Sequence, residues 1–240
     1  MMAHRQRGVA LLVALLVVAL ASLLIASLLD SGQLSLARSR NLLRGEQANA
    51  YAQGLEAYAA KVLVDDSNQG NDSNSDSWAV PMPPTPVPGG VISGTLREMN
   101  GCFNLNNLLR GEQPAPEWIK RFRRLLLNLQ LQPAIANAVV DWIDNDQTTA
   151  DSGAEDGGYL GRQPAYRTSG RPFTSVTELR LVAGVDAHTY NVLAPYVCAL
   201  PTPTTLNLNT ASVPVLMSLA SGMTQSVAAR VYNSGHANYT

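Results

Sequence analysis

An uninterrupted apolar run near the N-terminus limits what this chain can fold into more than any other feature. It extends from Val9 to Leu29, carries no charged side chain, and has only Ser22 and Ser27 as polar members. A helix needs about 20 consecutive apolar residues to cross the hydrocarbon core of a bilayer. The run is therefore long enough to be a membrane-spanning helix.

Arg5 and Arg7 precede the run, and Gly8 separates them from it. Because positive flanks stay on the cytoplasmic side, we expect the N-terminus in the cytoplasm and the rest of the chain outside. A cleaved secretory signal would have a shorter apolar region followed by a small-x-small site. Ala19 and Ala21 offer such a site only within the run, which favours a retained anchor.

The charge balance excludes a strongly basic surface. The chain has 17 basic and 18 acidic side chains, a net charge of −1. Without Arg5 and Arg7, 15 basic residues would face 18 acidic ones, a charge of −3. This balance is not the footprint of a protein that binds nucleic acid or anionic lipid.

The two cysteines, Cys102 and Cys198, both follow the apolar run. In an oxidising compartment such thiols favour a disulfide, with two buried free thiols as the alternative. The sequence has no C-x-x-C spacing, which argues against zinc or a redox dithiol.

The N-terminal half beyond the apolar run changes character three times. Helical periodicity continues to Leu63. Residues 65–77 are polar and residues 81–88 are proline-rich, which predicts a mobile surface loop and then an extended segment. Residues 91–108 have the β-propensity of a short strand pair. We expect the loop's acidic residues to be solvated rather than to chelate a cation: Asp65, Asp66, Asp72 and Asp76.

The second half is predicted to be helical. Pro116–Leu131 is amphipathic and opens with proline and glutamate, and a second helix is expected over Pro133–Ile143. The first helix carries a basic cluster, which we interpret as a solvated face, with an acidic partner as the alternative: Lys120, Arg121, Arg123 and Arg124.

A dense acidic segment is the strongest candidate for a metal site. Residues 141–156 hold six carboxylates and no basic residue, so the charges repel unless solvent or a cation separates them. The spacing from Asp144 to Glu155 partly follows a twelve-residue calcium loop, but Thr148 and Thr149 replace an acid and the required glycine. We predict a calcium loop of another geometry, with a solvated loop as the alternative and these ligands: Asp144, Asp146, Asp151, Glu155 and Asp156.

Two glycine turns form a doubled pattern. Val182–Val185 and Leu219–Met223 each precede a helical run, as in helix–hairpin–helix units, whose turn amides bind a DNA phosphate. Asp186 and Thr224 stand where the second glycine usually lies, and Asp186 would repel a phosphate. A packing or protein-contact module is therefore favoured over a DNA-binding one.

Several segments, in this order, resemble the type II secretion minor pseudopilin K family, also called general secretion pathway protein K. They are a basic leader ending at Gly8, FNLN at Phe103–Asn106, DWID at Asp141–Asp144, GAED at Gly153–Asp156, TELRLVAGV at Thr177–Val185 and LNLNTA at Leu206–Ala211. The resemblance extends over nearly the whole chain.

The resemblance implies processing of the N-terminus. In such proteins a prepilin peptidase cuts after the glycine, which is Gly8 here. The same enzyme methylates the new N-terminal residue, which would be Val9. Val13 is then the fifth mature residue, where most members have glutamate. A carboxylate inside a membrane persists only with a partner, which in the family is the terminal amine of a neighbouring subunit. Val13 therefore suits a subunit at the tip of a filament.

The resemblance also implies an α+β fold. It would combine a pilin-like long N-terminal helix and a small antiparallel sheet with a large inserted helical domain of the SAM-like or helix–hairpin–helix type, and calcium in the head. The expected division is a leader at 1–8, a transmembrane part at 9–29, pseudopilin helix, loop and sheet at 30–113, the helical domain at 114–231 and a tail at 232–240. Family members return to the sheet after the helical domain, so we expect an incomplete C-terminus, with a reduced sheet as the alternative.

No catalytic constellation can be assembled, because His4, His188 and His236 are isolated and neither GxSxG nor HExxH occurs. The resemblance implies a non-enzymatic subunit of a type II secretion pseudopilus, which initiates or caps it. A single inner-membrane span would hold its head in the periplasm. Expected partners are minor pseudopilins I, J and H, the prepilin peptidase and the inner-membrane assembly platform, without nucleic acid. Alternatives are a membrane-anchored DNA-uptake receptor, a calcium-responsive periplasmic anchor and a plain signal anchor.

Overall fold

The computed structural model describes residues 3–66, 70–201 and 204–239, with side chains from Val9 onward. The chain divides into two compact units: unit 1 is Met1–Lys61 with Pro83–Gly94, and unit 2 is Val62–Met82 with Thr95–Thr240. Residues 62–82 and 95–113 thus group with the helical part, whereas the predicted division assigns them to the pseudopilin segment.

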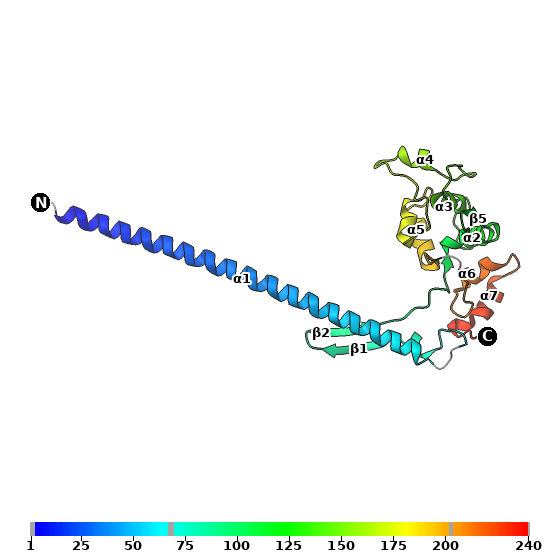
Figure 1. The fold of residues 1–240 in the computed structure, drawn as a ribbon, viewed down its shortest axis with the longest axis horizontal. Coiled ribbons are helices and arrows are strands. Elements are labelled where there is room, and N and C mark those ends of the chain that lie inside the picture. Colours follow the sequence, from blue (N-terminus) through cyan, green and yellow to red (C-terminus); the bar gives the residue numbers. More distant parts are fainter. Residues whose placement is uncertain (1–2, 67–69, 202–203, 240) are drawn as a thin grey trace. The chain divides into compact units, whose positions relative to one another are not determined.

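Unit 1 is built on one long helix, α1 (Ala3–Val64), which Figure 1 shows as continuous. Among the described residues it is the one helix long and apolar enough to cross a membrane, with a mean hydropathy of 3.1 in its most apolar window. Its large apolar side chains between Val9 and Leu29 are 54–71% exposed, as lipid-facing residues would be. The Ser22 hydroxyl donates to the Val18 carbonyl, which satisfies a polar group within the apolar segment.

A hairpin of β1 (Met82–Val87) and β2 (Gly90–Gly94) lies beside α1 within unit 1 (Figure 1). The Pro88 carbonyl accepts hydrogen bonds from Gln47 Nε2 at 2.8 Å and Tyr51 Oη at 3.1 Å, which fixes the turn to the helix. The prediction of a strand pair within 91–108 is therefore wrong in its pairing. The proline-rich segment, expected only to be extended, supplies the first strand.

The polar loop buries two of its side chains where the structure describes it. Ser73 is fully buried, and its amide and hydroxyl donate to the Asp76 carboxylate at 2.7 and 3.0 Å. A 3-10 turn follows at Ser77–Ala79 and buries Trp78. Most of residues 70–77 are exposed, as predicted for a surface loop, but Asp76 is buried rather than solvated. Residues 67–69 lie outside the described residues.

Unit 2 contains two small sheets among its described residues. In one, β3 (Phe103–Asn104) pairs in parallel with β6 (Val197–Cys198). In the other, β4 (Leu109–Arg110) pairs antiparallel with β5 (Gln113–Pro114). A 3-10 turn at Leu105–Leu108 connects them.

The helices of unit 2 occupy the four segments predicted to be helical and two others, Asp156–Leu160 and Val213–Leu219. Its α-helices are α2 (Pro116–Asn128), α3 (Ile135–Ile143), α4 (Asp156–Leu160), α5 (Ala187–Leu193), α6 (Val213–Leu219) and α7 (Gln225–Tyr232). Further 3-10 turns lie at Val176–Leu181, Ala194–Tyr196 and Asn233–Gly235. Proline in the first turn of α2 fits there because that amide needs no partner. The α+β fold with a pilin-like helix and a helix-rich second part is confirmed.

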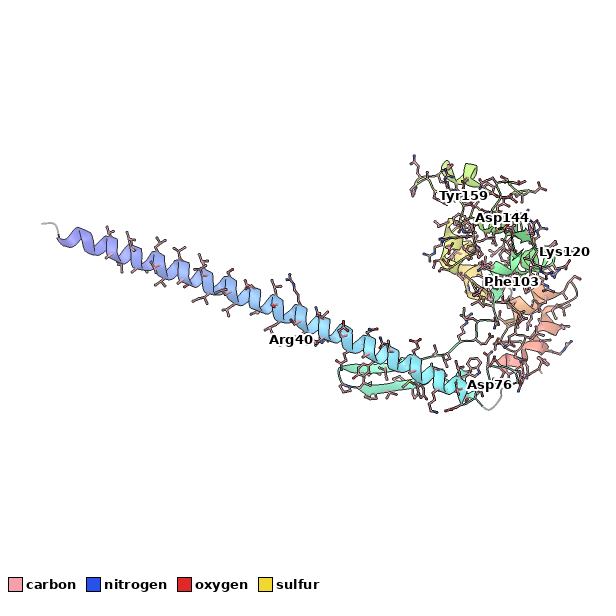
Figure 2. The ribbon with its side chains drawn as sticks, viewed as in Figure 1. Arg40, Asp76, Phe103, Lys120, Asp144 and Tyr159 are labelled. Carbon is pink, nitrogen blue, oxygen red and sulfur yellow. A yellow bond between two sulfur atoms is a disulfide. The ribbon has the colours of Figure 1, made fainter. Side chains whose placement is uncertain are left out.

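The core of unit 2 surrounds Phe103, labelled in Figure 2, which is fully buried. Its ring stacks on Phe122 at 5.3 Å between centroids and meets Trp118 edge-on at 5.5 Å. The amphipathic face of α2 buries Leu125 and Leu126 in the same cluster. This core fixes the C-terminal end of α3, where the predicted metal loop begins.

Candidate metal centre

Three buried carboxylates meet at the end of α3. Asp141 lies in its last turn, Asp144 directly follows it, and Glu155 directly precedes α4. Each offers an oxygen, and these oxygens lie within 4.8 Å of one another. The residues are 1%, 6% and 5% exposed, so solvent does not separate their charges. Asp144 is labelled in Figure 2.

The loop backbone is built around Asp141. Its Oδ2 accepts a hydrogen bond from the Ala150 amide at 3.1 Å. A Cβ atom at Gly153 would overlap this carboxylate, so only glycine fits there. In contrast, Asp144 Oδ1 and both carboxylate oxygens of Glu155 are buried without a hydrogen-bond partner among the described residues. Buried acceptors left unpaired cost free energy, so these oxygens suit the coordination of a cation.

The pKa values of the three carboxyl groups also favour a bound cation. Burial, and then the charges of Asp146 and Asp141, raise the pKa of Asp144 to about 6. Burial, followed by the charge of Asp144, raises the pKa of Glu155 to about 7. Burial also raises the pKa of Asp141, although backbone hydrogen bonds oppose it. The three carboxylates repel one another when all are ionised. A hard cation such as calcium, which prefers oxygen ligands, would stabilise their ionised forms.

The structure brings together only part of the predicted ligand set. Asp146 is exposed, and its Oδ1 accepts the Thr148 amide at 2.6 Å. Asp151 is exposed as well, and its backbone carbonyl accepts a bond from Asn137. Asp156 turns away to Arg167 and Thr168. Of the predicted ligands, only Asp144 and Glu155 lie together in the buried cluster. Their binding of calcium stays a prediction.

Asp141 was omitted from the predicted ligands because the calcium-loop count started at Asp144. The spacing of Asp141 and Asp144 by three residues was the available signal, since residues at i and i+3 share one side of a helix.

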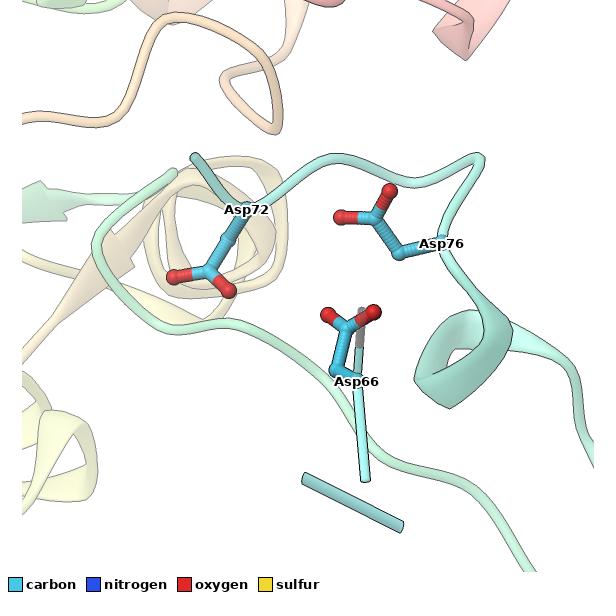
Figure 3. A group of neighbouring side chains, drawn as sticks. All are labelled: Asp66, Asp72 and Asp76. Carbon is cyan, nitrogen blue, oxygen red and sulfur yellow. The ribbon is translucent and has the colours of Figure 1, made fainter. Parts of the chain in front are cut away.

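A second acidic cluster lies in the loop after α1, where Figure 3 shows the carboxylates of Asp66, Asp72 and Asp76 near one another. It differs from the first in two respects. Asp72 is exposed and Asp66 is half-buried, and the carboxylate of Asp76 already accepts the Ser73 amide and hydroxyl.

Cys102 and Cys198 form a disulfide with a Cα–Cα distance of 5.8 Å and a sequence separation of 96. This is the favoured pairing of the sequence analysis. The bond lies directly beside the β3–β6 ladder, in which Asn104 is paired with Cys198. It therefore closes unit 2 where its first and last strands meet.

The predicted processing residues lie in α1. The structure describes burial only from Val9 onward, and Val9 and Val13 are 60% and 54% exposed. Cleavage after Gly8 and methylation at Val9 remain predictions.

In each of the two hairpin turns, a side chain caps the N-terminus of the helix that follows. Asp186 Oδ1 accepts the Thr189 amide at 2.7 Å, and this bond lowers the pKa of Asp186. Thr224 Oγ1 likewise accepts the Val227 amide at 3.3 Å. An ionised carboxylate at the first turn repels a phosphate, which supports the packing interpretation of the doubled pattern.

The basic cluster of α2 also serves packing. The Arg124 guanidinium donates to the carbonyls of Ser218 at 2.7 Å and Leu219 at 3.1 Å, at the C-terminal end of α6. Arg121 stacks over the Trp118 ring at 4.8 Å. Lys120, labelled in Figure 2, pairs with Glu117 at 2.9 Å. Lys120 and Arg123 are exposed, as the prediction of a solvated face requires, whereas Arg124 packs against the end of α6.

Comparison with known proteins identifies a family domain that includes the three buried carboxylates. Residues 101–202 match the family described as type II secretion system (T2SS), protein K. Type II secretion system protein K of Pseudomonas aeruginosa is 40% identical over 231 residues, covering 91% of this chain and 69% of that protein. The Aeromonas hydrophila protein of the same name is also 40% identical, with 86% and 68% covered.

A solved structure agrees. The crystal structure of the GspK-GspI-GspJ complex from the enterotoxigenic Escherichia coli type 2 secretion system contains a chain 32% identical to this one. The TM-score is 0.69, and the match covers 76% of this chain and 68% of that one. The chain therefore belongs to the type II secretion system protein K family, the K-type minor pseudopilins.

Proposed function

We propose that this chain is the tip subunit of a periplasmic pseudopilus and initiates or caps its assembly, without enzymatic activity of its own. The observation that carries the proposal is the unbroken apolar character of α1 from Val9 to Leu29, with Val13 at the fifth position after Gly8. A subunit with a carboxylate there needs a neighbour's amine inside the membrane. This chain has no such need.

The proposed partners are minor pseudopilins I and J, because the solved relative is a complex that contains proteins of both names. A tip subunit of a pseudopilus would have further partners. These are minor pseudopilin H, the prepilin peptidase and the inner-membrane assembly platform. Before assembly α1 would anchor the chain in the inner membrane, with unit 2 in the periplasm. The bulk of unit 2 would then obstruct addition of a further subunit above it.

Labelling of assembled pseudopili tests the tip position. An epitope tag on the chain, detected by immunogold microscopy on pseudopili from cells that overproduce the major subunit, should mark one end of each filament. Label spread along the filaments would refute the tip role, and the same tag on the major subunit is the control.

We also propose that the centre holds calcium through Asp144 and Glu155, with Asp141 completing the carboxylate set. A bound divalent cation would neutralise the three charges and join the end of α3 to the start of α4. The unpartnered oxygens of Asp144 and Glu155 support this assignment. Isothermal titration of the metal-free full chain with calcium should show binding, and Glu155→Gln should weaken it at least about tenfold, since a charged ligand is lost.

A further inference from the structure

One segment passes beside the proposed metal centre. This segment, which we call the strap, comprises residues 167–172 between α4 and the 3-10 turn at Val176–Leu181. It is anchored at both ends by contacts that involve none of the three carboxylates. At one end the Tyr166 hydroxyl donates to the Leu181 carbonyl at 2.8 Å. At the other, Phe173 is buried and its amide donates to Asn106 Oδ1 at 2.7 Å.

Between these anchors the strap is held by Asp156. Its Oδ1 accepts both the amide and the hydroxyl of Thr168, each at 3.0 Å. Its Oδ2 pairs with the Arg167 guanidinium at 3.2 Å. One carboxylate thus makes three contacts with two successive strap residues.

The other side of the strap meets the end of α3. The Gly170 amide donates to the Trp142 carbonyl at 3.1 Å. Gly170 has a φ of +55°, and a Cβ atom there would lie 3.6 Å from the Asp144 carbonyl oxygen. The positive φ is what favours glycine here, since a Cβ at 3.6 Å would make only ordinary van der Waals contact with Asp144.

Each point of attachment is next in sequence to a carboxylate of the centre. Asp156 follows Glu155, and Trp142 follows Asp141. Without a cation, repulsion among the buried carboxylates favours separation of the α3 end from the α4 start. That separation would also pull apart the two points that hold the strap.

We propose that Asp156 is a positioning residue through which calcium at the centre orders the strap, rather than a calcium ligand. The inference rests on the proposed calcium site. Its consequence is local: calcium controls residues 167–172, while the anchors at Tyr166 and Phe173 persist in the metal-free protein.

Hydrogen exchange on the full chain in detergent micelles tests this, because it reports on the amides of Thr168 and Gly170. Saturating calcium should slow their exchange at least about tenfold, the range expected for local opening. Amides of α5 should be unaffected. In Asp156→Ala the Thr168 amide should exchange rapidly even with calcium bound, while calcium affinity by titration stays within about threefold of the parent.

Two further variants sharpen the result. Asp156→Asn can still accept the Thr168 bonds but cannot pair with Arg167 as an ion, so its exchange should be intermediate. Gln147→Ala changes an exposed side chain of the same loop that is not a predicted ligand, and it should leave strap exchange unchanged.

Three outcomes would overturn the proposal, and they are distinguishable. Calcium binding without slower strap exchange would reject the coupling alone. A large loss of calcium affinity in Asp156→Ala would make Asp156 a ligand. No calcium binding by the parent chain would reject the calcium centre and the coupling together.

Discussion

Asn106 and Asn209 make the same pair of hydrogen bonds in two places of unit 2. Asn106 Oδ1 accepts the Phe173 amide and its Nδ2 donates to the Phe173 carbonyl, at 2.7 and 2.9 Å. Asn209 Oδ1 likewise accepts the Tyr239 amide at 2.6 Å, and its Nδ2 donates to the Tyr239 carbonyl at 3.0 Å. Each is the second asparagine of an apolar-Asn-apolar-Asn motif, and in each motif the first asparagine accepts the amide of the second. The FNLN and LNLN motifs thus use the same hydrogen-bond arrangement, each to bind the backbone of a residue distant in sequence, Phe173 or Tyr239.

Asn106→Ala should therefore destabilise the fold. Asn106 is 3% exposed, so its loss leaves the Phe173 amide and carbonyl buried and unpaired. We expect a loss of about 3 kcal/mol in the free energy of unfolding, measured by urea denaturation in detergent. Asn145→Ala, at an exposed position, is the control, and equal stability of the two variants would contradict the assignment.

The disulfide should contribute strongly to the stability of unit 2. The bond joins residues separated by 96 positions, so it restricts a large loop of the unfolded chain. Cys102→Ser with Cys198→Ser should lower the free energy of unfolding by about 2–5 kcal/mol. Thermal melting with and without reductant measures this, and a parent chain insensitive to reductant would speak against it.

The metal-free protein should become less stable as pH rises from about 4 to about 7. The folded pKa values of Asp144 and Glu155, about 6 and about 7, lie above their ordinary values of 3.8 and 4.5. The folded state therefore binds more protons than the unfolded state in this window, and stability falls as they are released. Melting temperatures across this range in chelator should decline. The double variant Asp144→Asn with Glu155→Gln should show a flatter profile, and matching profiles would reject the carboxylates as the cause.

Calcium should reverse this trend, because the ion binds the ionised carboxylates. At pH 7, excess calcium should raise the melting temperature of the parent by several degrees, a linkage effect that grows with ligand concentration. The double variant should be more stable than the parent in chelator and should not respond to calcium. An unchanged parent melting temperature in excess calcium would contradict the site.

The sequence predicted most of the elements, for identifiable reasons. The unbroken apolar run of α1 and the 3.6-residue periodicity of α2 are local signals that packing reinforces. The pairing of β1 with β2 was missed because Pro83, Pro84 and Pro86 argue against a strand, although an edge strand tolerates proline.

The site was partly predictable. Asp144 and Glu155 were identified from their spacing, but Asp156 points to the strap for reasons that only the tertiary arrangement reveals. The packed loop around Ser73 and Asp76 was missed since its composition is that of a solvated segment, and its burial depends on contacts with residues far along the chain, such as Asn207, which donates to the Asp72 carbonyl.

The identity of the first residue of the mature protein tests the central claim most directly. Mass spectrometry of the N-terminal peptide from membranes of cells that contain the prepilin peptidase should find methylated Val9. A chain that begins at Met1, or that is cut beyond Leu29, would contradict its role as a pseudopilin retained by α1.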